Sequence, residues 1–157
     1  MSTTLKPIVY RGGIVSFNIP VNWREEYERA GGATFYEEGQ DTGTLRLNVL
    51  SFEKKRGSAS DPAGDFPDTL GSGLRLRRYR TECEERGTKL CLYRWEILVP
   101  ITADRWRLVC FSHTVLASKN ETEGTRRELE LVDALVREAN YSTAPGIIPK
   151  PWWKFWG

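Results

Sequence analysis

Histidine is almost absent from this sequence, and its scarcity excludes much of the usual chemistry of enzymes. His113 is the only histidine in 157 residues, which excludes most zinc sites built from imidazole ligands. The sequence also contains no Cys-x-x-Cys spacing, no Gly-x-Ser-x-Gly motif, no phosphate-binding loop and no dinucleotide-binding fingerprint. We therefore expect no catalytic residue, no cofactor and no metal ion, and we predict that the protein is not an enzyme.

Cysteine is scarce as well, and long apolar runs are missing. The three cysteines, Cys83, Cys91 and Cys110, are an odd number, and the first residues of the chain lack the apolar run of a signal peptide. We therefore expect free thiols and a cytoplasmic protein. Nowhere does the sequence contain the run of about 18 apolar residues that a membrane-spanning helix needs.

The chain also lacks a strong excess of charge of either sign. It has 23 lysines and arginines against 21 aspartates and glutamates, a net charge of +2, which argues against a dedicated binder of polyanions. The segment Arg75-Leu-Arg-Arg-Tyr-Arg80 has the basic and aromatic character of a nucleic-acid contact. However, strand alternation divides its arginines between two faces, and three glutamates follow by residue 85. We predict no nucleic-acid partner.

What is present indicates one α+β domain over residues 1–142, large enough to bury a core without a metal or disulfide. The pattern predicts an antiparallel sheet of about six strands flanked by helices. The expected elements are a strand or hairpin at 8–19 bent at Gly12-Gly13, a short helix at 22–31, strands at 33–37, 44–53, 74–85, 89–99 and 105–117, and an amphipathic helix at 120–140. Residues 54–73 are expected to form a long loop with one helical turn near 65–70.

The turns between the long strands predict their register. A turn centred on Gly87 places Cys83 opposite Cys91, and a turn at 102–104 places Ile97 opposite Cys110. The face that carries these residues is the more apolar one, so we expect it to be the core face. Cys110 is then expected to be a small buried hydrophobic residue.

The other face of this predicted sheet places Arg80, Arg94 and His113 in one row. Like charges directly opposite each other destabilise a sheet, so the row needs an explanation. One interpretation is a solvated surface on which Glu82 and Glu96 bridge diagonally. The other is an anion-binding site, in which two guanidinium groups and an imidazole hold a carboxylate or phosphate. Both interpretations remain open at this point.

Residues 143–157 form a tail rich in proline and tryptophan. Its prolines disfavour a helix before Trp152, and it ends with the candidate partner-binding residues Trp152, Trp153, Phe155 and Trp156. The tail is expected to pack on its own domain, to contact a partner protein or a second copy of the chain in a homodimer, or to insert at a membrane surface.

The strand that ends in Phe17-x-Ile-Pro-x-x-Trp23, the glycine-flanked strands and the closing amphipathic helix together resemble the PsbP-like superfamily, which includes the bacterial DcrB-like proteins. The resemblance covers about residues 8–140. It implies an α/β/α sandwich around an antiparallel sheet and mostly non-catalytic binding roles. No functional residue of the family is carried over, because none of its partner-binding positions is matched here.

Two functional hypotheses follow from the sequence. The first is a non-catalytic protein-interaction domain, with an immunity protein against a toxin as its most specific form. The second is a small-anion or metabolite-binding domain that uses Arg80, Arg94 and His113.

Overall fold

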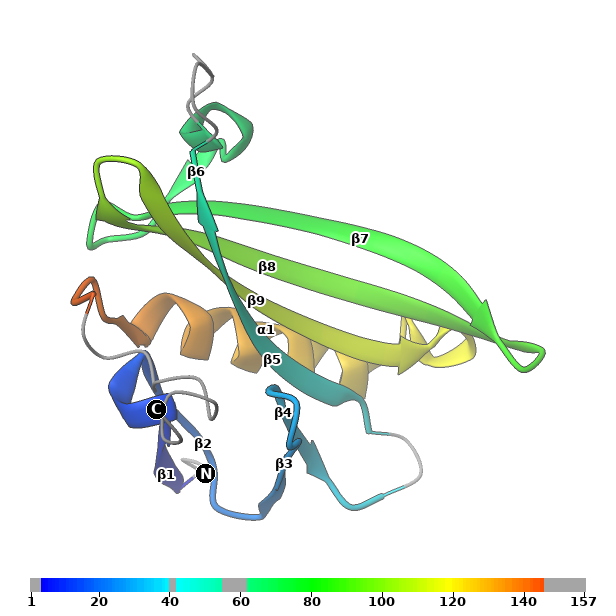
Figure 1. Cartoon of the computed structure of the whole chain (residues 1–157). Coiled ribbons are helices and arrows are strands. Elements are labelled where there is room, and N and C mark those ends of the chain that lie inside the picture. Colours follow the sequence, from blue (N-terminus) through cyan, green and yellow to red (C-terminus); the bar gives the residue numbers. More distant parts are fainter. Residues whose placement is uncertain (1–3, 40–41, 55–61, 146–157) are drawn as a thin grey trace.

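The computed structural model describes residues 4–39, 42–54 and 62–145 (Figure 1). Its strands form two antiparallel sheets. The smaller sheet has the order β1-β2-β10, with bounds Leu5–Tyr10, Val15–Pro20 and Asn140–Tyr141. The larger has the order β3-β4-β5-β9-β8-β7-β6, with bounds Trp23–Tyr27 (β3), Ala33–Glu37 (β4), Thr44–Glu53 (β5), Arg105–Leu116 (β9), Thr88–Thr102 (β8), Arg75–Glu85 (β7) and Asp68–Thr69 (β6). The helix α1 spans Glu123–Glu138, and 3-10 turns lie at Arg11–Gly13, Pro62–Asp65 and Ala117–Lys119.

The small sheet and α1 pack on the same face of the large sheet, and the core lies between them (Figure 1). Phe17 of β2 joins the two sheets, because its ring contacts Phe35 and Phe111 edge to face with centroid distances of 5.4 and 5.5 Å. The helix contributes Val132, Leu135 and Val136 to this core. These positions confirm the amphipathic pattern that the sequence predicted for the helix.

The antiparallel sheet and the hairpin at β1–β2 are confirmed, but two parts of the predicted fold class need correction. The large sheet has seven strands, more than the six expected. In the described residues α1 is the only α-helix, so the sheet is not flanked by helices on both faces. The helix also begins later than predicted, since its cap is Thr122, whose Oγ1 accepts a hydrogen bond of 3.2 Å from the amide of Thr125.

The predicted helix at 22–31 is wrong, because these residues form the edge strand β3 and its turn into β4. The glutamates that suggested a solvated helix surface belong instead to an exposed edge. There Glu25 accepts a hydrogen bond of 2.7 Å from the Tyr27 hydroxyl and pairs with Lys6 at 2.9 Å. Gly31 and Gly32 do not cap a helix. Their φ angles of 102° and 107° form the turn between the two strands.

The predicted register between β7 and β8 is wrong by one residue. Their turn has two central residues, Arg86 and Gly87, with φ angles of 52° and 81°, as in the turns typical of tight hairpins. Cys83 therefore lies opposite Leu90, not opposite Cys91. A shift of one residue moves every side chain of a strand to the other face, so Leu76 of β7 is buried in the core while Tyr79 is exposed.

The register between β8 and β9 is also shifted by one residue, for a different reason. The turn itself lies where it was predicted, with Thr102 opposite Arg105, but an irregularity between Pro100 and Thr102 changes the pairing beyond it. Ile97 consequently lies opposite Val109 instead of Cys110. Cys110 is therefore not a core residue.

The described part of the 54–73 segment also differs from its prediction. Instead of a helical turn near 65–70, it has a 3-10 turn at Pro62–Asp65 followed by the short strand β6. Phe66 and Leu70 anchor the segment, since both are buried. Residues 55–61 and the tail from residue 146 onward lie outside the described residues.

Candidate functional site

The structure separates the three residues of the predicted anion site. Arg80 and His113 lie in one row on the core face, with Tyr93 of β8 between them. Arg94 is the next residue after Tyr93, so it lies on the opposite face of the sheet. The predicted row of Arg80, Arg94 and His113 is therefore not formed, because it depended on the register that the tight turn and the irregularity shift.

The surroundings of His113 close it off from solution. The side chain is fully buried, and its Nε2 lies 3.6 Å from Oε2 of Glu128 on α1. The Glu128 carboxylate also accepts the backbone N–H of Gly43, at 3.1 and 3.2 Å. Arg80 instead pairs with Glu82 at 2.9 Å on the surface. A dissolved anion has no access to this imidazole, so the histidine belongs to the interior of the fold.

The large sheet has a second face that no α-helix covers within residues 4–39, 42–54 and 62–145. In Figure 1 both α1 and the small sheet lie on the other side of the long strands. We call the face without an α-helix the outer face. The strand pairing assigns to it the even-numbered residues of β5, β8 and β9 and the odd-numbered residues of β7.

One end of the outer face is apolar. Leu50, Leu108 and Leu98 form one cross-strand row, and Phe52, Trp106 and Pro100 form the next. We call these six residues the apolar end. Leu50 is 52% exposed and Phe52 is 37% exposed, whereas Leu98 is buried. The rings of Phe52 and Trp106 stack with centroids 5.6 Å apart. Large apolar side chains that gather at one exposed place are typical of a binding surface.

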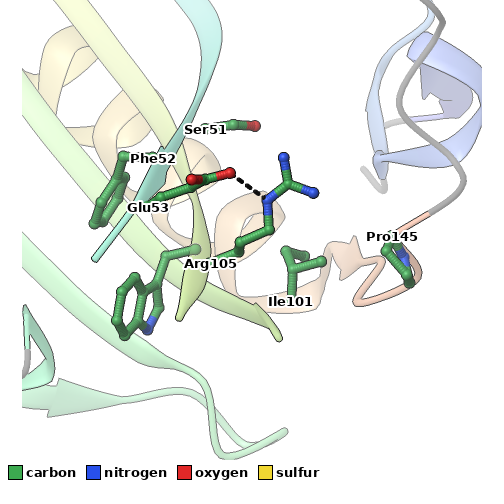
Figure 2. Close-up of a pocket in the computed structure, with 7 residues that line it drawn as sticks. Ser51, Phe52, Glu53, Ile101, Arg105 and Pro145 are labelled. Carbon is green, nitrogen blue, oxygen red and sulfur yellow. Dashed lines mark ion pairs between the residues drawn. The ribbon is translucent and has the colours of Figure 1, made fainter. Parts of the chain in front are cut away.

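A pocket of about 200 Å³ opens at the edge of this apolar end (Figure 2). Phe52 and Trp106 line it on one side, and Ile101 and Pro145 on the other. Figure 2 shows the ion pair between Arg105 and Glu53, which forms part of the pocket wall. Nε of Arg105 lies 3.0 Å from Oε1 of Glu53. The pocket thus has an aromatic wall beside a polar rim, which suits an apolar side chain. It lies at the edge between the two faces, because Ser51, Glu53 and Arg105 belong to the face opposite Phe52 and Trp106.

The middle of the outer face is polar. The Arg77 guanidinium donates to Oε1 of Glu96 from Nε at 2.8 Å and from Nη2 at 2.6 Å, and it stacks on the buried Phe66 ring at 4.5 Å. Cys110 lies beside this pair, with its Sγ 3.8 Å from Oε2 of Glu96. Burial, together with the Glu96 charge, raises the pKa of the Cys110 thiol to about 11. The thiol is therefore protonated at neutral pH and is not an activated nucleophile.

The next row of the outer face contains Arg46, Ser112, Arg94 and Tyr79, one residue from each of β5, β9, β8 and β7. Arg46 and Tyr79 are exposed, and Arg94 is half-buried. No carboxylate in the described part of the chain forms an ion pair with Arg46 or Arg94. Of the predicted anion-binding residues, only Arg94 thus lies on this open surface. It shares its row with Arg46, two strands away, which the sequence analysis did not select.

The tail residues Trp152, Trp153, Phe155 and Trp156 lie outside the described residues, so their predicted role is not tested. The sequence analysis missed the apolar end. Its signal was the alternation of Leu50 and Phe52 with polar residues in β5, opposite Trp106 and Leu108. Within the described ranges, no cluster of three metal-binding side chains occurs, and no helix is long and apolar enough to cross a membrane.

Comparisons with known proteins identify solved structures of similar fold but no matching family. No family model matches the chain, and no curated protein matches it. A solved protein from Bacteroides thetaiotaomicron VPI-5482 superposes with a TM-score of 0.56 and 16% identity, over 87% of this chain and 48% of that one. LpqN, described as involved in cell envelope biogenesis of Mycobacterium tuberculosis, superposes with a TM-score of 0.57 and 11% identity, over 87% of this chain and 90% of LpqN.

The fold is shared with these two bacterial proteins. The chain spans about half the length of the Bacteroides protein and most of the length of LpqN. Identities of 16% and 11% show likeness of fold alone.

Proposed function

We propose that the chain is a non-catalytic protein-interaction domain and that its partner binds on the outer face of the large sheet. The observation that carries the proposal is the apolar end, where Leu50 and Phe52 remain half exposed beside a pocket with an aromatic wall. Burying such side chains against a partner removes apolar surface from water, which is the main favourable term in protein association. Aromatic residues in a central position are also the usual energetic anchors of an interface.

The chemistry of the site supports binding over catalysis. The thiol beside the outer face is held protonated, and the single histidine is buried next to Glu128 with no exposed nucleophile beside it. The polar groups in the middle of the face include Arg77, Arg94 and Tyr79, and arginine and tyrosine are enriched in protein interfaces. An open sheet face of this kind suits a protein surface or an extended segment.

Within this class we propose the PsbP-like group, and its DcrB-like members in particular, as the family of the chain. The supporting residues are those of the Phe17-x-Ile-Pro-x-x-Trp23 segment and the antiparallel sheet that follows it. An immunity protein that blocks one toxin is the most specific form of this proposal. The three free thiols favour a reducing compartment such as the cytoplasm.

The C-terminal aromatic residues are proposed as a second contact with the partner. Pro145, the last described residue, lines the pocket at the apolar end, so the chain continues from there into the tryptophan-rich tail. A homodimer through the tail is the alternative to a contact with a different protein.

Site-specific photocrosslinking in the cells of origin tests the proposal. A photoreactive phenylalanine analogue at Leu50 is expected to form one discrete adduct with another protein. The same analogue at Arg127, an exposed residue of α1, is the matched control and is expected to form none. Equal labelling from both positions, or none from Leu50, would refute binding at the outer face. An adduct of twice the mass of the chain would show a homodimer instead.

A further inference from the structure

The outer face carries two arginines that form no ion pair within the residues that the structure describes. Arg46 and Arg94 lie in the same row, separated by Ser112 on β9. Strands in a sheet are about 4.8 Å apart, so the two Cα atoms are about 10 Å apart. Long side chains at this spacing can converge on one group above the serine.

Within the described residues, no carboxylate of the outer face forms an ion pair with Arg46 or Arg94. Glu96 is engaged by Arg77 through two short contacts, and Glu85 lies at the far end of the β7–β8 hairpin. Glu26 of β3 lies in the same row, two strands from Arg46. Its carboxylate accepts a hydrogen bond of 2.9 Å from the hydroxyl of Tyr36. The positive charge at Arg46 and Arg94 is therefore available to a ligand.

We propose that Arg46 and Arg94 bind an acidic side chain of the partner protein. This inference rests on the interaction proposed above and specifies the chemistry of the partner. Planar guanidinium groups form paired hydrogen bonds with a carboxylate. The row of Arg46 and Arg94 lies two rows from the apolar end, beyond the row of Cys110 and Glu96. A partner that extends from the apolar end over both rows also removes water there, which strengthens the charged contact.

The geometry also sets the spacing of the partner's recognition residues. The row of Arg46 is four residues from Leu50 along β5, a distance of about 13 Å. An extended partner segment needs an acidic residue about four positions from its apolar anchor to span this distance. A helical segment needs about nine positions.

The apolar end argues for a protein partner over a nucleic acid. Phosphate backbones are held by continuous tracks of basic residues, whereas here two arginines share one sheet face with rows of leucine, phenylalanine and tryptophan. A free phosphate would leave the apolar end uncovered. An acidic and apolar peptide satisfies both parts of the surface.

A library of random 12-residue peptides displayed on phage is the probe that tests this proposal. Peptides selected on the wild-type protein are expected to combine Asp or Glu with an apolar residue at the spacing above. A synthetic copy of the most enriched peptide should bind the Arg94→Ala variant at least about 10-fold more weakly. The affinity of the Arg94→Lys variant should lie between those of the wild type and Arg94→Ala, because lysine keeps the charge but lacks the planar guanidinium group.

The controls separate this inference from the proposed function. Arg127→Ala on α1 should leave peptide binding unchanged, and Arg94→Ala should unfold at the same urea concentration as the wild type. If the peptides bind Leu50→Ser weakly but bind Arg46→Ala and Arg94→Ala as well as the wild type, the two arginines do not bind an acidic side chain. That result would overturn this inference but not the proposed interaction at the outer face. No enrichment on the wild-type protein, or tighter binding of a single-stranded oligonucleotide than of any peptide, would overturn both.

Discussion

Replacing Gly43 with alanine tests the packing of the buried histidine. A Cβ added at this glycine would lie 2.8 Å from Cε1 of His113 and 2.8 Å from Cγ1 of Val115, and it would also meet the histidine Nε2. Ordinary contact begins at 3.4 Å, so these atoms are too close by 0.6 Å. Both side chains are buried, at 0% and 4% exposure, and neither can swing into solvent. We therefore expect Gly43→Ala to be destabilised by overpacking.

Overpacking of a core costs about 1–3 kcal/mol. For a chain of this size the expected fall in Tm is about 2–4 °C for each kcal/mol. Urea unfolding monitored by circular dichroism measures the change in the free energy of unfolding, provided that its dependence on urea concentration (the m value) is the same in both proteins. Gly124→Ala is the matched control, since nothing lies within 4 Å of its added Cβ and alanine is the better helix former. This control is expected to be at least as stable as the wild type.

A double-mutant cycle identifies the cause of the effect. In a His113→Ala background most of the steric conflict is gone, so Gly43→Ala should cost at least about 0.5 kcal/mol less than in the wild type. A Gly43→Ala variant as stable as the wild type would refute the packing argument. Additive effects in the cycle would show that His113 is not the residue in conflict.

Three further predictions concern the helix, the core and the cysteines. Phe17→Ala removes the ring that joins the two sheets and should cost about 3–5 kcal/mol in urea unfolding; a loss below 1 kcal/mol would contradict the packing described. Burial alone would raise the pKa of Asp133, but hydrogen bonds from Trp95 and Arg137 and the charge of Arg78 lower it below 3.8. The pKa of Asp133 is higher in the unfolded chain than in the folded protein. The ionised carboxylate therefore stabilises the fold fully above about pH 4, and this stabilisation is lost as the pH falls through the pKa of the folded protein. Asp133→Asn should therefore be less stable at pH 7 and lose less stability on acidification, and parallel pH curves would refute this. Iodoacetamide at pH 8 should label the exposed Cys83 well before Cys110, whose pKa is raised to about 11; equal rates by mass spectrometry would contradict it.

Local patterns predicted most elements of this fold, because alternation and helical periodicity are properties of short segments. Strand β5 was expected at 44–53 and is found at Thr44–Glu53. The segment at 22–31 failed because an exposed edge strand and a solvated helix surface have similar charged compositions. The two glycines that end it suit either a helix cap or a turn.

The candidate site depended on register, and register was not readable from the sequence. A turn centred on Gly87 and a turn centred between Arg86 and Gly87 differ by half a residue, yet they place opposite sets of side chains on the outer face. The irregularity beside Pro100 likewise left no distinct pattern. For these reasons Arg94 was wrongly grouped with Arg80 and His113, and Arg46, which shares its row, was not selected.

The most direct test of the central claim is the affinity of the photocrosslinked partner for two matched variants. The Leu50→Ser/Phe52→Ser double variant alters exposed residues of the apolar end, and Arg127→Ala alters the exposed side of α1. Isothermal titration is expected to give at least about a 10-fold loss of affinity for the double variant, as for the anchor residues of an interface. Arg127→Ala should bind within twofold of the wild type. Unchanged affinity of the double variant, or a larger loss for Arg127→Ala, would contradict binding at the outer face.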